Sequence, residues 1–549
     1  MQRLLLILGA ACSGYYGKDP KLWPKPASAT FSKNLCSLSS AFKFVNRPSR
    51  DNTKFDEVLN RAVTRANDEV HSLFTFGVPV RATCEISECT VESVDASSGW
   101  LPTLESESYQ ISLVDGVCLI SCLSARGCMH GLTTFVQLID PLMGFAIPAS
   151  ISIDDAPAFA HRGLMIDTGR RFLPVWLIMQ NLRVMHCAKI NVLHWHIVDD
   201  HSFPLVSEAY PFLSSKGAYS DRMVYTRADI QKIVAYANDL GIRVIPELDV
   251  PGHTQSWMLG YPELLGIAKS AIDPSREENY VFLANLLKEV EVSFRSPFFA
   301  GDSPVHLGGD ETWDGWDTPD LRKWMAAHGL NNKGDLAKLW ISRLEEIAQK
   351  NAVEIVLWED FLQDMEVSVC SATGVCDRSI TWQMWKQDWD ETLAWARKHS
   401  SERVVWSSKF YLDDLNREWN DFYGLKIVDN VPNLLGGEAC MWGESVDEFN
   451  FMSRVWPRAA AVAERLWTNP DSPATAATSR LAKWICRSRH FFKTPIGNAG
   501  KVPSDDPDVE WIWHTEREQW HCEEEDVLNE GARLRLNREA TDETVVLVQ

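Results

Sequence analysis

Two adjacent carboxylates, Asp310 and Glu311, end the apolar segment HLGGDE at 306–311. A Gly-Gly backbone can turn tightly, and paired acids suit acid catalysis on a bond that must gain a proton. Neighbouring side chains of a strand point to opposite faces, so both acids reach one pocket only where a strand ends. We therefore predict that the pair lies at the C-terminal end of a strand. Taken alone, the segment also fits a solvated surface turn.

Eight short apolar runs separated by helical stretches can position such a pair. This alternation is typical of a parallel sheet with crossover helices. The runs are Gly163–Asp167, Ile190–Val198, Arg243–Leu248, Val305–Gly308, Val353–Trp358, Ser379–Trp385, Arg403–Trp406 and Leu434–Met441. They predict an α/β fold, a (β/α)8 TIM barrel, in which enzymes build their sites at the C-terminal ends of the strands.

A smaller domain is expected before the barrel. A helical stretch, Lys54–Leu73, is followed by alternating segments such as Tyr109–Leu113 and Val117–Leu123, a mixture typical of an α+β domain. We divide the chain into an α+β domain at 18–155, a catalytic barrel at 156–490 and a C-terminal extension at 491–549.

Composition excludes several classes of function. The 549 residues are 45% hydrophobic and 10% aromatic, which is usual for a globular protein with a large core. A formal net charge of -21 and a pI near 5.2 argue against binding to nucleic acid or to an anionic membrane surface. No segment is long and apolar enough for a membrane span.

The first residues predict entry into the secretory pathway. Met1–Arg3, an apolar run from Leu4 to Ala11 and small residues after it have the order of a signal peptide, which we place at 1–17. Thirteen cysteines fit an oxidising compartment, outside the cell or in a lysosome-like or vacuole-like organelle. The disulfide pairs that we would test first are Cys370 with Cys376 and Cys486 with Cys522.

Seven ordered motifs between about residues 101 and 467 resemble one enzyme family. They are LPTLESESY (101–109), HRGLMIDTGRRFLP (161–174), KINVLHWHIVDDHSFPL (189–205), DVPGHTQSW (249–257), HLGGDE (306–311), GGEACMWGE (436–444) and WPRAAAVAERLW (456–467). Together they make the chain similar to the β-N-acetylhexosaminidases of glycoside hydrolase family 20, especially the eukaryotic lysosomal type. The resemblance implies an N-terminal α+β domain, a catalytic barrel, and no cofactor or metal.

The resemblance also implies a mechanism in which the acetamido oxygen of the substrate is the nucleophile. Glu311 then protonates the glycosidic oxygen and later activates water. Asp310 holds the acetamide N–H and stabilises an oxazolinium intermediate, while His253 and Asp199 orient and tune the acid. For a general acid we expect a raised pKa on Glu311, from burial and from the neighbouring carboxylate.

A sugar pocket follows from the same resemblance. Trp358, Trp385 and Trp442 are expected around a terminal N-acetylhexosamine ring, since aromatic rings pack on the apolar faces of sugars. The residues that would bond its polar groups are Arg162, Glu444 and, at the acetamide oxygen, Tyr411. Asp413 and Asp414 stand where some relatives carry a basic residue, so we expect neutral substrates to be preferred.

Other readings remain open. His194 and His196 share one face of a strand and could bind a metal, although no further His-rich strand end completes a ligand set. The same barrel could also be a sugar-binding protein without activity. Trp313 and Trp316 could line a second sugar subsite or serve packing. Relatives are often dimers, so a homodimer is allowed, and the natural substrate is open among chitin oligomers, N-glycans and glycolipids.

Overall fold

The computed structural model describes most of the chain in two compact units. The described residues are 21–47, 53–73, 82–93, 107–139, 145–296, 304–363, 380–425, 427, 431–492 and 496–497. The predicted signal peptide and almost all of the predicted C-terminal extension lie outside them. Among the described helices, none has the length and apolar character needed to cross a membrane.

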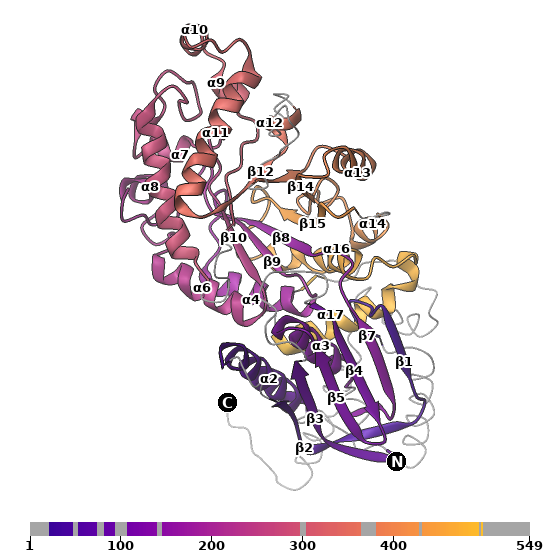
Figure 1. The fold of residues 1–549 in the computed structure, drawn as a ribbon. Coiled ribbons are helices and arrows are strands. Elements are labelled where there is room, and N and C mark those ends of the chain that lie inside the picture. The colour runs from indigo at the N-terminus through magenta and orange to yellow at the C-terminus, as the bar shows by residue number, and fades with distance from the viewer. Residues whose placement is uncertain are drawn as a thin grey trace, which may run out of the picture. The chain divides into compact units, whose positions relative to one another are not determined.

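The first unit is built on a seven-stranded mixed sheet, in the order β1-β7-β4-β5-β3-β2-β6 over the described residues (Figure 1). Two amphipathic helices, α2 (Thr53–Leu73) and α3 (Ala125–Leu138), pack against each other and the sheet. The strands are β1 (Ser28–Phe31), β2 (Leu35–Arg47), β3 (Cys84–Ser93), β4 (Tyr109–Val114), β5 (Val117–Cys122), β6 (Ala146–Pro148) and β7 (Ile151–Asp155). The predicted small α+β domain is thus confirmed.

Three disulfides staple this unit, and none is a predicted pair. They join Cys36 to Cys84, Cys89 to Cys118 and Cys122 to Cys128. The first two link neighbouring strands, which the sequence does not reveal because pairing depends on strand order. Of the predicted cysteines, three lie outside the described residues, and the side chain of Cys486 is also not described.

All eight predicted runs are strands of one closed parallel barrel, described within 156–469. They are β8 (His161–Asp167), β9 (Val192–His196), β10 (Arg243–Glu247), β11 (Pro304–His306), β12 (Glu354–Trp358), β13 (Ile380–Met384), β14 (Arg403–Trp406) and β15 (Leu434–Met441). The barrel closes where its last strand in the sequence, β15, pairs with its first, β8. The paired residues run from Gly436 with His161 to Met441 with Ile166. The barrel prediction is confirmed.

Helices surround the barrel strands (Figure 1). The longer ones are α4 (Val175–Cys187), α6 (Arg227–Asp239), α8 (Glu277–Phe294), α10 (Pro319–Ala327), α11 (Lys333–Asn351), α13 (Trp389–Lys398) and α16 (Arg458–Trp467). Short ones are α5 (Phe212–Gly217), α7 (Gln255–Met258), η2 (Pro262–Leu264), α9 (Trp313–Trp316), α12 (Asp360–Gln363), α14 (Trp419–Tyr423) and α15 (Phe451–Val455). Their apolar sides bury the outward-facing residues of the strands, such as Trp195 against Phe294. The short helix η3 (Ala474–Ala476) belongs to the first unit.

The barrel ends earlier than the predicted residue 490. Helix α17 (Thr478–Phe492) belongs to the first unit, which takes the chain again from Pro470. Arg480 and Arg487 donate hydrogen bonds from this helix to the carbonyls of Leu22 and Ile139. A pairing between segments more than 300 residues apart is not visible in a local pattern.

Arg162 lies at the start of β8, and its side chain is 0% exposed. Its guanidinium forms a buried ion pair with Glu107 and donates to the carbonyls of Lys189 and Phe159. In a parallel barrel the strand starts lie at the end opposite to the catalytic face. The predicted sugar contact of Arg162 is therefore wrong, and the residue is part of the fold.

We predict that Arg162→Met lowers the free energy of unfolding by about 3–5 kcal/mol, because Glu107 keeps a buried charge without its cationic partner. The double variant Arg162→Met/Glu107→Leu should recover most of that loss. Urea titration of the variants measures both values. Equal destabilisation by the single and double variants would contradict the assigned ion pair.

Candidate active site

The turn that follows β11 brings the acid pair to the C-terminal end of the barrel. Gly308 and Gly309 have φ values of 60° and 96°, and Glu311 itself has a φ of 50°. A Cβ at Gly308 would collide with the carboxylate of Asp249, and the Gly309 N–H donates to the same carboxylate at 3.1 Å. Both glycines are therefore required by the close approach of the backbone.

The two carboxylates have different surroundings. The side chain of Asp310 is 11% exposed, whereas that of Glu311 is 66% exposed. Atom Oδ1 of Asp310 is buried and accepts no hydrogen bond from the described residues. Since a buried acceptor without a donor is costly, this oxygen is suited to an N–H group supplied by a ligand.

His253 lies between the acid pair and Asp199. Its Nε2 is 3.5 Å from Asp310 Oδ2 and 3.6 Å from Glu311 Oε2, and its Nδ1 is 3.6 Å from Asp199 Oδ1. Burial opposes a charge on the imidazole, but the surrounding carboxylates, Asp249 first among them, raise its pKa above the usual value. His253 is thus a cation among acids, held in a left-handed backbone conformation with φ of 52°.

The expected rise in the pKa of Glu311 is wrong for this arrangement. The facing imidazole of His253, 3.6 Å away, lowers the pKa of Glu311, and this effect exceeds the opposing effects of burial and of Asp310. The physical reason is exposure, because a carboxylate that remains in water loses little solvation. The sequence shows the neighbouring acid but not the solvent or the histidine.

Asp199 contacts two basic side chains, His196 and Arg170, as well as His253. It follows β9, and its Oδ2 lies 2.8 Å from His196 Nε2 and 3.0 Å from Arg170 Nη1. Burial opposes its charge, but the hydrogen bond with His196 and the nearby imidazole of His253 hold the pKa of Asp199 well below its usual range. The predicted pair Asp199 and His253 therefore lies together beside the acids.

Arg170 occupies the place predicted for Arg162. It follows the end of β8, donates to Asp167 at 2.9 Å and reaches Glu444 at 3.1 Å through Nε. Its guanidinium carbon lies 4.7 Å from the centre of the Trp442 ring. Sequence reasoning missed Arg170 although it lies in the same motif, because it chose the arginine at the start of the strand over the one after its end.

Aromatic side chains form one wall. The rings of Trp385 and Tyr411 are 6.3 Å apart and nearly parallel, and Trp442 lies 6.4 Å from Tyr411. Trp358, only 1% exposed, packs beneath them 6.0 Å from Trp442. The structure thus brings together the predicted tryptophans and the predicted tyrosine, with Trp358 as a floor.

Asp360 was not predicted and connects this wall to the acid. Its Oδ2 accepts from Trp385 Nε1 at 2.7 Å, and its Oδ1 accepts from the backbone N–H of Glu311 at 3.2 Å and from Lys386 Nζ at 2.8 Å. The position directly after β12 was the available signal, since it follows Trp358 by two residues. Asp360 fixes the turn that carries Glu311.

The histidines of the alternative metal site, His194 and His196, face carboxylates inside the barrel. His194, Glu247 and His306 do bring ligand atoms within 4.8 Å, so the argument that no further strand end completes a set is wrong. However, His194 lies 2.7 Å from Glu438 and 2.9 Å from Glu247, and these carboxylates raise its pKa to about 9 although burial lowers it. A carboxylate on each side therefore favours the doubly protonated imidazole, which has no lone pair for a metal.

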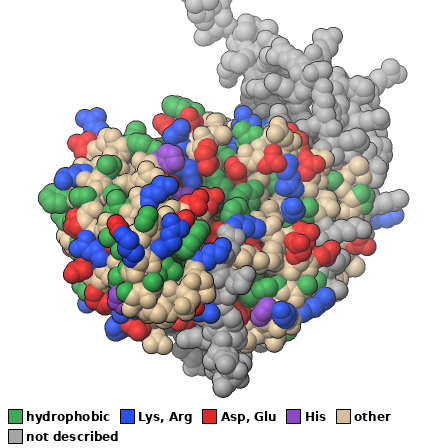
Figure 2. All heavy atoms as spheres, turned by 90° about the horizontal axis from the view of Figure 1, so that it is seen from above, with side chains coloured by type: hydrophobic (Ala, Val, Ile, Leu, Met, Phe, Trp, Pro, Cys, Tyr) green, Lys and Arg blue, Asp and Glu red, His purple; other side chains and the backbone are tan. Residues whose placement is uncertain are grey.

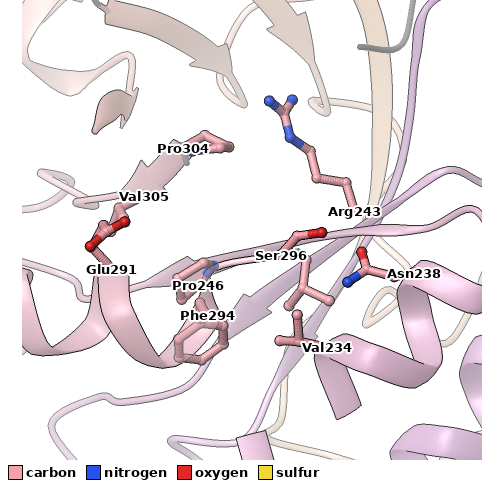
Figure 3. Close-up of a pocket in the computed structure, with 10 residues that line it drawn as sticks. Val234, Asn238, Arg243, Pro246, Glu291, Phe294, Ser296, Pro304 and Val305 are labelled. Carbon is pink, nitrogen blue, oxygen red and sulfur yellow. The ribbon is translucent and has the colours of Figure 1, made fainter. Parts of the chain in front are cut away.

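Two other features do not belong to the candidate site. A pocket between β10, β11, α6 and α8, where Arg243 and Pro304 begin their strands, lies at the opposite end of these strands (Figure 3). Trp316 is buried against Trp340 and donates to the Ile272 carbonyl, so it serves packing; Trp313 is only partly buried. On the face drawn in Figure 2, acidic and basic side chains of the described residues are interspersed.

Comparisons with known proteins agree with this geometry. The family model described as "Glycosyl hydrolase family 20, catalytic domain" matches residues 159–470, and one described as "beta-acetyl hexosaminidase like" matches 22–138. The β-hexosaminidase subunit beta of Rattus norvegicus is 34% identical, with 90% of this chain and 95% of the relative covered. β-Hexosaminidase 3 of Arabidopsis thaliana is 31% identical, with 89% and 93% covered.

A solved structure gives the same result. The chitobiase of Flavobacterium johnsoniae superimposes with a TM-score of 0.72 at 27% identity, over 86% of this chain and 72% of the other. Barrel, site and relatives therefore agree: the chain belongs to glycosyl hydrolase family 20 and is a glycoside hydrolase of the β-N-acetylhexosaminidase type.

Proposed function

We propose that the protein removes terminal, non-reducing β-linked N-acetylglucosamine or N-acetylgalactosamine with retention of configuration, using the acetamido group of the substrate as nucleophile. One observation carries the proposal. Asp310 offers a buried oxygen without a hydrogen-bond donor directly beside Glu311, which is open to solvent. An acetamide N–H would satisfy this oxygen and turn the acetamide oxygen toward the anomeric carbon.

In the first step Glu311 gives its proton to the glycosidic oxygen, and the bond from that oxygen to the anomeric carbon breaks. The acetamide oxygen forms a new bond to the same carbon, giving an oxazolinium ion whose charge Asp310 stabilises. Tyr411 donates its hydroxyl hydrogen to the acetamide oxygen. In the second step the Glu311 carboxylate takes a proton from water, whose oxygen attacks the anomeric carbon. The bond from that carbon to the acetamide oxygen breaks, which regenerates the acetamide and restores the original configuration.

Binding of the substrate would also raise the pKa of Glu311, which a general acid requires. A sugar over the aromatic wall and a leaving group above Glu311 would exclude water from this carboxyl. Desolvation raises the pKa of a carboxyl and opposes the lowering by His253. Arg170, Glu444 and the tryptophans would hold the ring in place.

Glu311→Gln should lower kcat on a chromogenic β-N-acetylglucosaminide by about a hundredfold or more, the usual contribution of a general acid. Asp310→Asn should lower kcat by a similar order, because the oxazolinium charge loses its carboxylate. A thiazoline inhibitor that mimics this intermediate should block the wild type and bind Asp310→Asn more weakly. The exposed Glu448→Gln is the matched control and should keep wild-type kinetics.

A wild type that binds N-acetylglucosamine yet releases no product from acidic to neutral pH would instead support a sugar-binding protein. Proton NMR of the first product formed gives the anomer. A first product with the α-configuration would reject retention and with it the substrate-assisted route.

Charge near Tyr411 bears on substrate choice. Asp413 is half-buried, its Oδ1 is buried without a hydrogen-bond partner among the described residues, and burial raises its pKa to about 6. Glu444 adds a second negative charge nearby. We propose that this charge disfavours sulfated or sialylated substrates and leaves neutral glycans as the substrates.

The discrimination should depend on pH. Asp413 is mostly charged at pH 7 and mostly protonated at pH 5, so repulsion of an anion falls as the pH falls through about 6. The ratio of kcat/KM for a sulfated over a neutral N-acetylglucosaminide should therefore rise from pH 7 to pH 5. Asp413→Asn should raise the ratio at pH 7 and flatten its pH dependence; an unchanged ratio would exclude Asp413 as the cause.

Chelators separate the proposed metal-free mechanism from the metal-dependent alternative. Because His194 and His196 are paired with carboxylates, activity should persist within twofold after prolonged dialysis against EDTA. Loss of activity that only one divalent metal restores would revive a metal site at His194, Glu247 and His306.

The setting of the reaction is also a proposal. Three disulfides among the described residues of the first unit support folding in the secretory pathway, with a secreted or lysosome-like location. We also propose a homodimer, since relatives such as the rat and mouse proteins are named as subunits. Chitin oligomers, N-glycans and glycolipids all present the terminal sugar that this site fits.

A further inference from the structure

Glu247 ends β10, and its carboxylate is wholly buried inside the barrel. Oxygen Oε1 accepts the indole N–H of Trp358 at 2.8 Å, and Oε2 lies 2.5 Å from Nδ1 of His196. Trp358 packs beneath the aromatic wall, and His196 is the first of the groups that connect Glu247 to the acid Glu311. One carboxylate therefore contacts both halves of the site.

The histidine side of this contact runs through three further groups. Nε2 of His196 lies 2.8 Å from Asp199, Asp199 lies 3.6 Å from His253, and His253 lies 3.6 Å from Glu311. An imidazole that faces carboxylates with both nitrogens donates to both only when it carries two protons. Burial opposes this charge, but Glu247 raises the pKa of His196 well above its usual value.

The tryptophan side sets the floor of the sugar pocket. Trp358 packs in a buried cluster, with Trp385, Tyr411 and Trp442 resting on it. The N–H of such a buried indole needs an acceptor, and Glu247 is that acceptor, so the bond favours one orientation of the ring. The bond therefore fixes the plane on which the substrate-binding rings rest.

The remaining groups that face Glu247 balance its charge. His194 Nε2 lies 2.9 Å away, and His306 Nδ1 lies 3.1 Å away. Burial opposes ionisation of Glu247, but these histidines and His196 lower its pKa well below the usual range. Asp249, two residues further along the chain, is the acidic neighbour, and burial raises its pKa.

Resting on the proposed function, we infer that Glu247 is a positioning residue that couples the sugar-binding floor to the chain of groups that orients Glu311. Loss of its charge then disturbs the histidine chain, and loss of its oxygen also disturbs the floor. A purely structural buried carboxylate would alter stability but leave kcat and KM of the folded enzyme unchanged.

Two substitutions separate the two contacts. Glu247→Gln keeps an acceptor oxygen for Trp358 but presents an uncharged amide to His196, so kcat should fall about tenfold with KM within about twofold. Glu247→Leu removes both contacts, so KM should also rise by about tenfold. Trp358→Phe removes the indole N–H together with the pyrrole ring but leaves Glu247 facing His196, so KM should rise with kcat nearly unchanged.

Glu438→Gln is the matched control. Glu438 is equally buried and accepts from His194 at 2.7 Å, from His161 at 3.0 Å and from Gln383 at 2.8 Å. Among the described residues, no hydrogen bond or ion pair joins its carboxylate to Trp358 or His196. Both Glu→Gln variants should lower the melting temperature, but Glu438→Gln should keep wild-type kcat and KM per folded enzyme, counted by titration with the thiazoline inhibitor.

Nitrogen-15 NMR of the His196 imidazole gives a readout that does not depend on turnover. At pH 7 the wild type should show two protonated nitrogens and Glu247→Gln only one. A wild type that hydrolyses nothing, together with this change at His196, would reject the proposed function and support the link through Glu247.

The inference is overturned by an active wild type whose Glu247→Gln variant keeps both the doubly protonated His196 and wild-type kcat. It is equally overturned if Glu438→Gln lowers kcat as much as Glu247→Gln, since general loosening of the barrel would then explain both.

Discussion

Charge buried inside the barrel is the constraint on which the rest of the site depends. An ion removed from water is costly unless a partner of opposite charge and well-placed hydrogen bonds replace its solvation. Glu247 and Glu438 meet this condition by sharing the protonated His194 between them, and Glu247 also holds His196. Because Glu438 lies on β15 and both histidines lie on β9, Glu438 can meet His194 only when β15 pairs with β8 and closes the barrel. Asp199 follows His196 by three residues and extends this charge network to the end of the strand.

Two groups of the acid network have a strained backbone. His253 and Glu311 both have a positive φ although neither is glycine; the N–H of Glu311 is held by Asp360, and His253 lies between Asp199 and the acid pair. Such conformations persist only where the surroundings determine them fully. The buried core beneath the site, with Trp358 at its centre, supplies that support, so stability of the barrel and geometry of the acid pair are linked.

The fold was predictable because its signals are local. Each of the eight apolar runs is a strand, and the turn after β11 carries the acid pair as the Gly-Gly backbone required. The choice between Arg162 and Arg170 was less predictable, since one lies at the start and the other just after the end of one strand, within one motif. Only the position of the strand start, at His161, shows that Arg162 faces Glu107 at the far end and that Arg170 meets Trp442.

The sequence by itself determined the barrel, the family and the pair Asp310 and Glu311, because apolar periodicity and motif spacing are properties of neighbouring residues. Only the tertiary structure decided the direction in which the pKa of each site residue shifts and the residue at which the barrel unit ends. The pKa of Glu311 is lowered because His253 reaches it from another strand end and water reaches it from outside. Solvent exposure and charge pairing across strands depend on distances in space, which the order of residues along the chain does not contain.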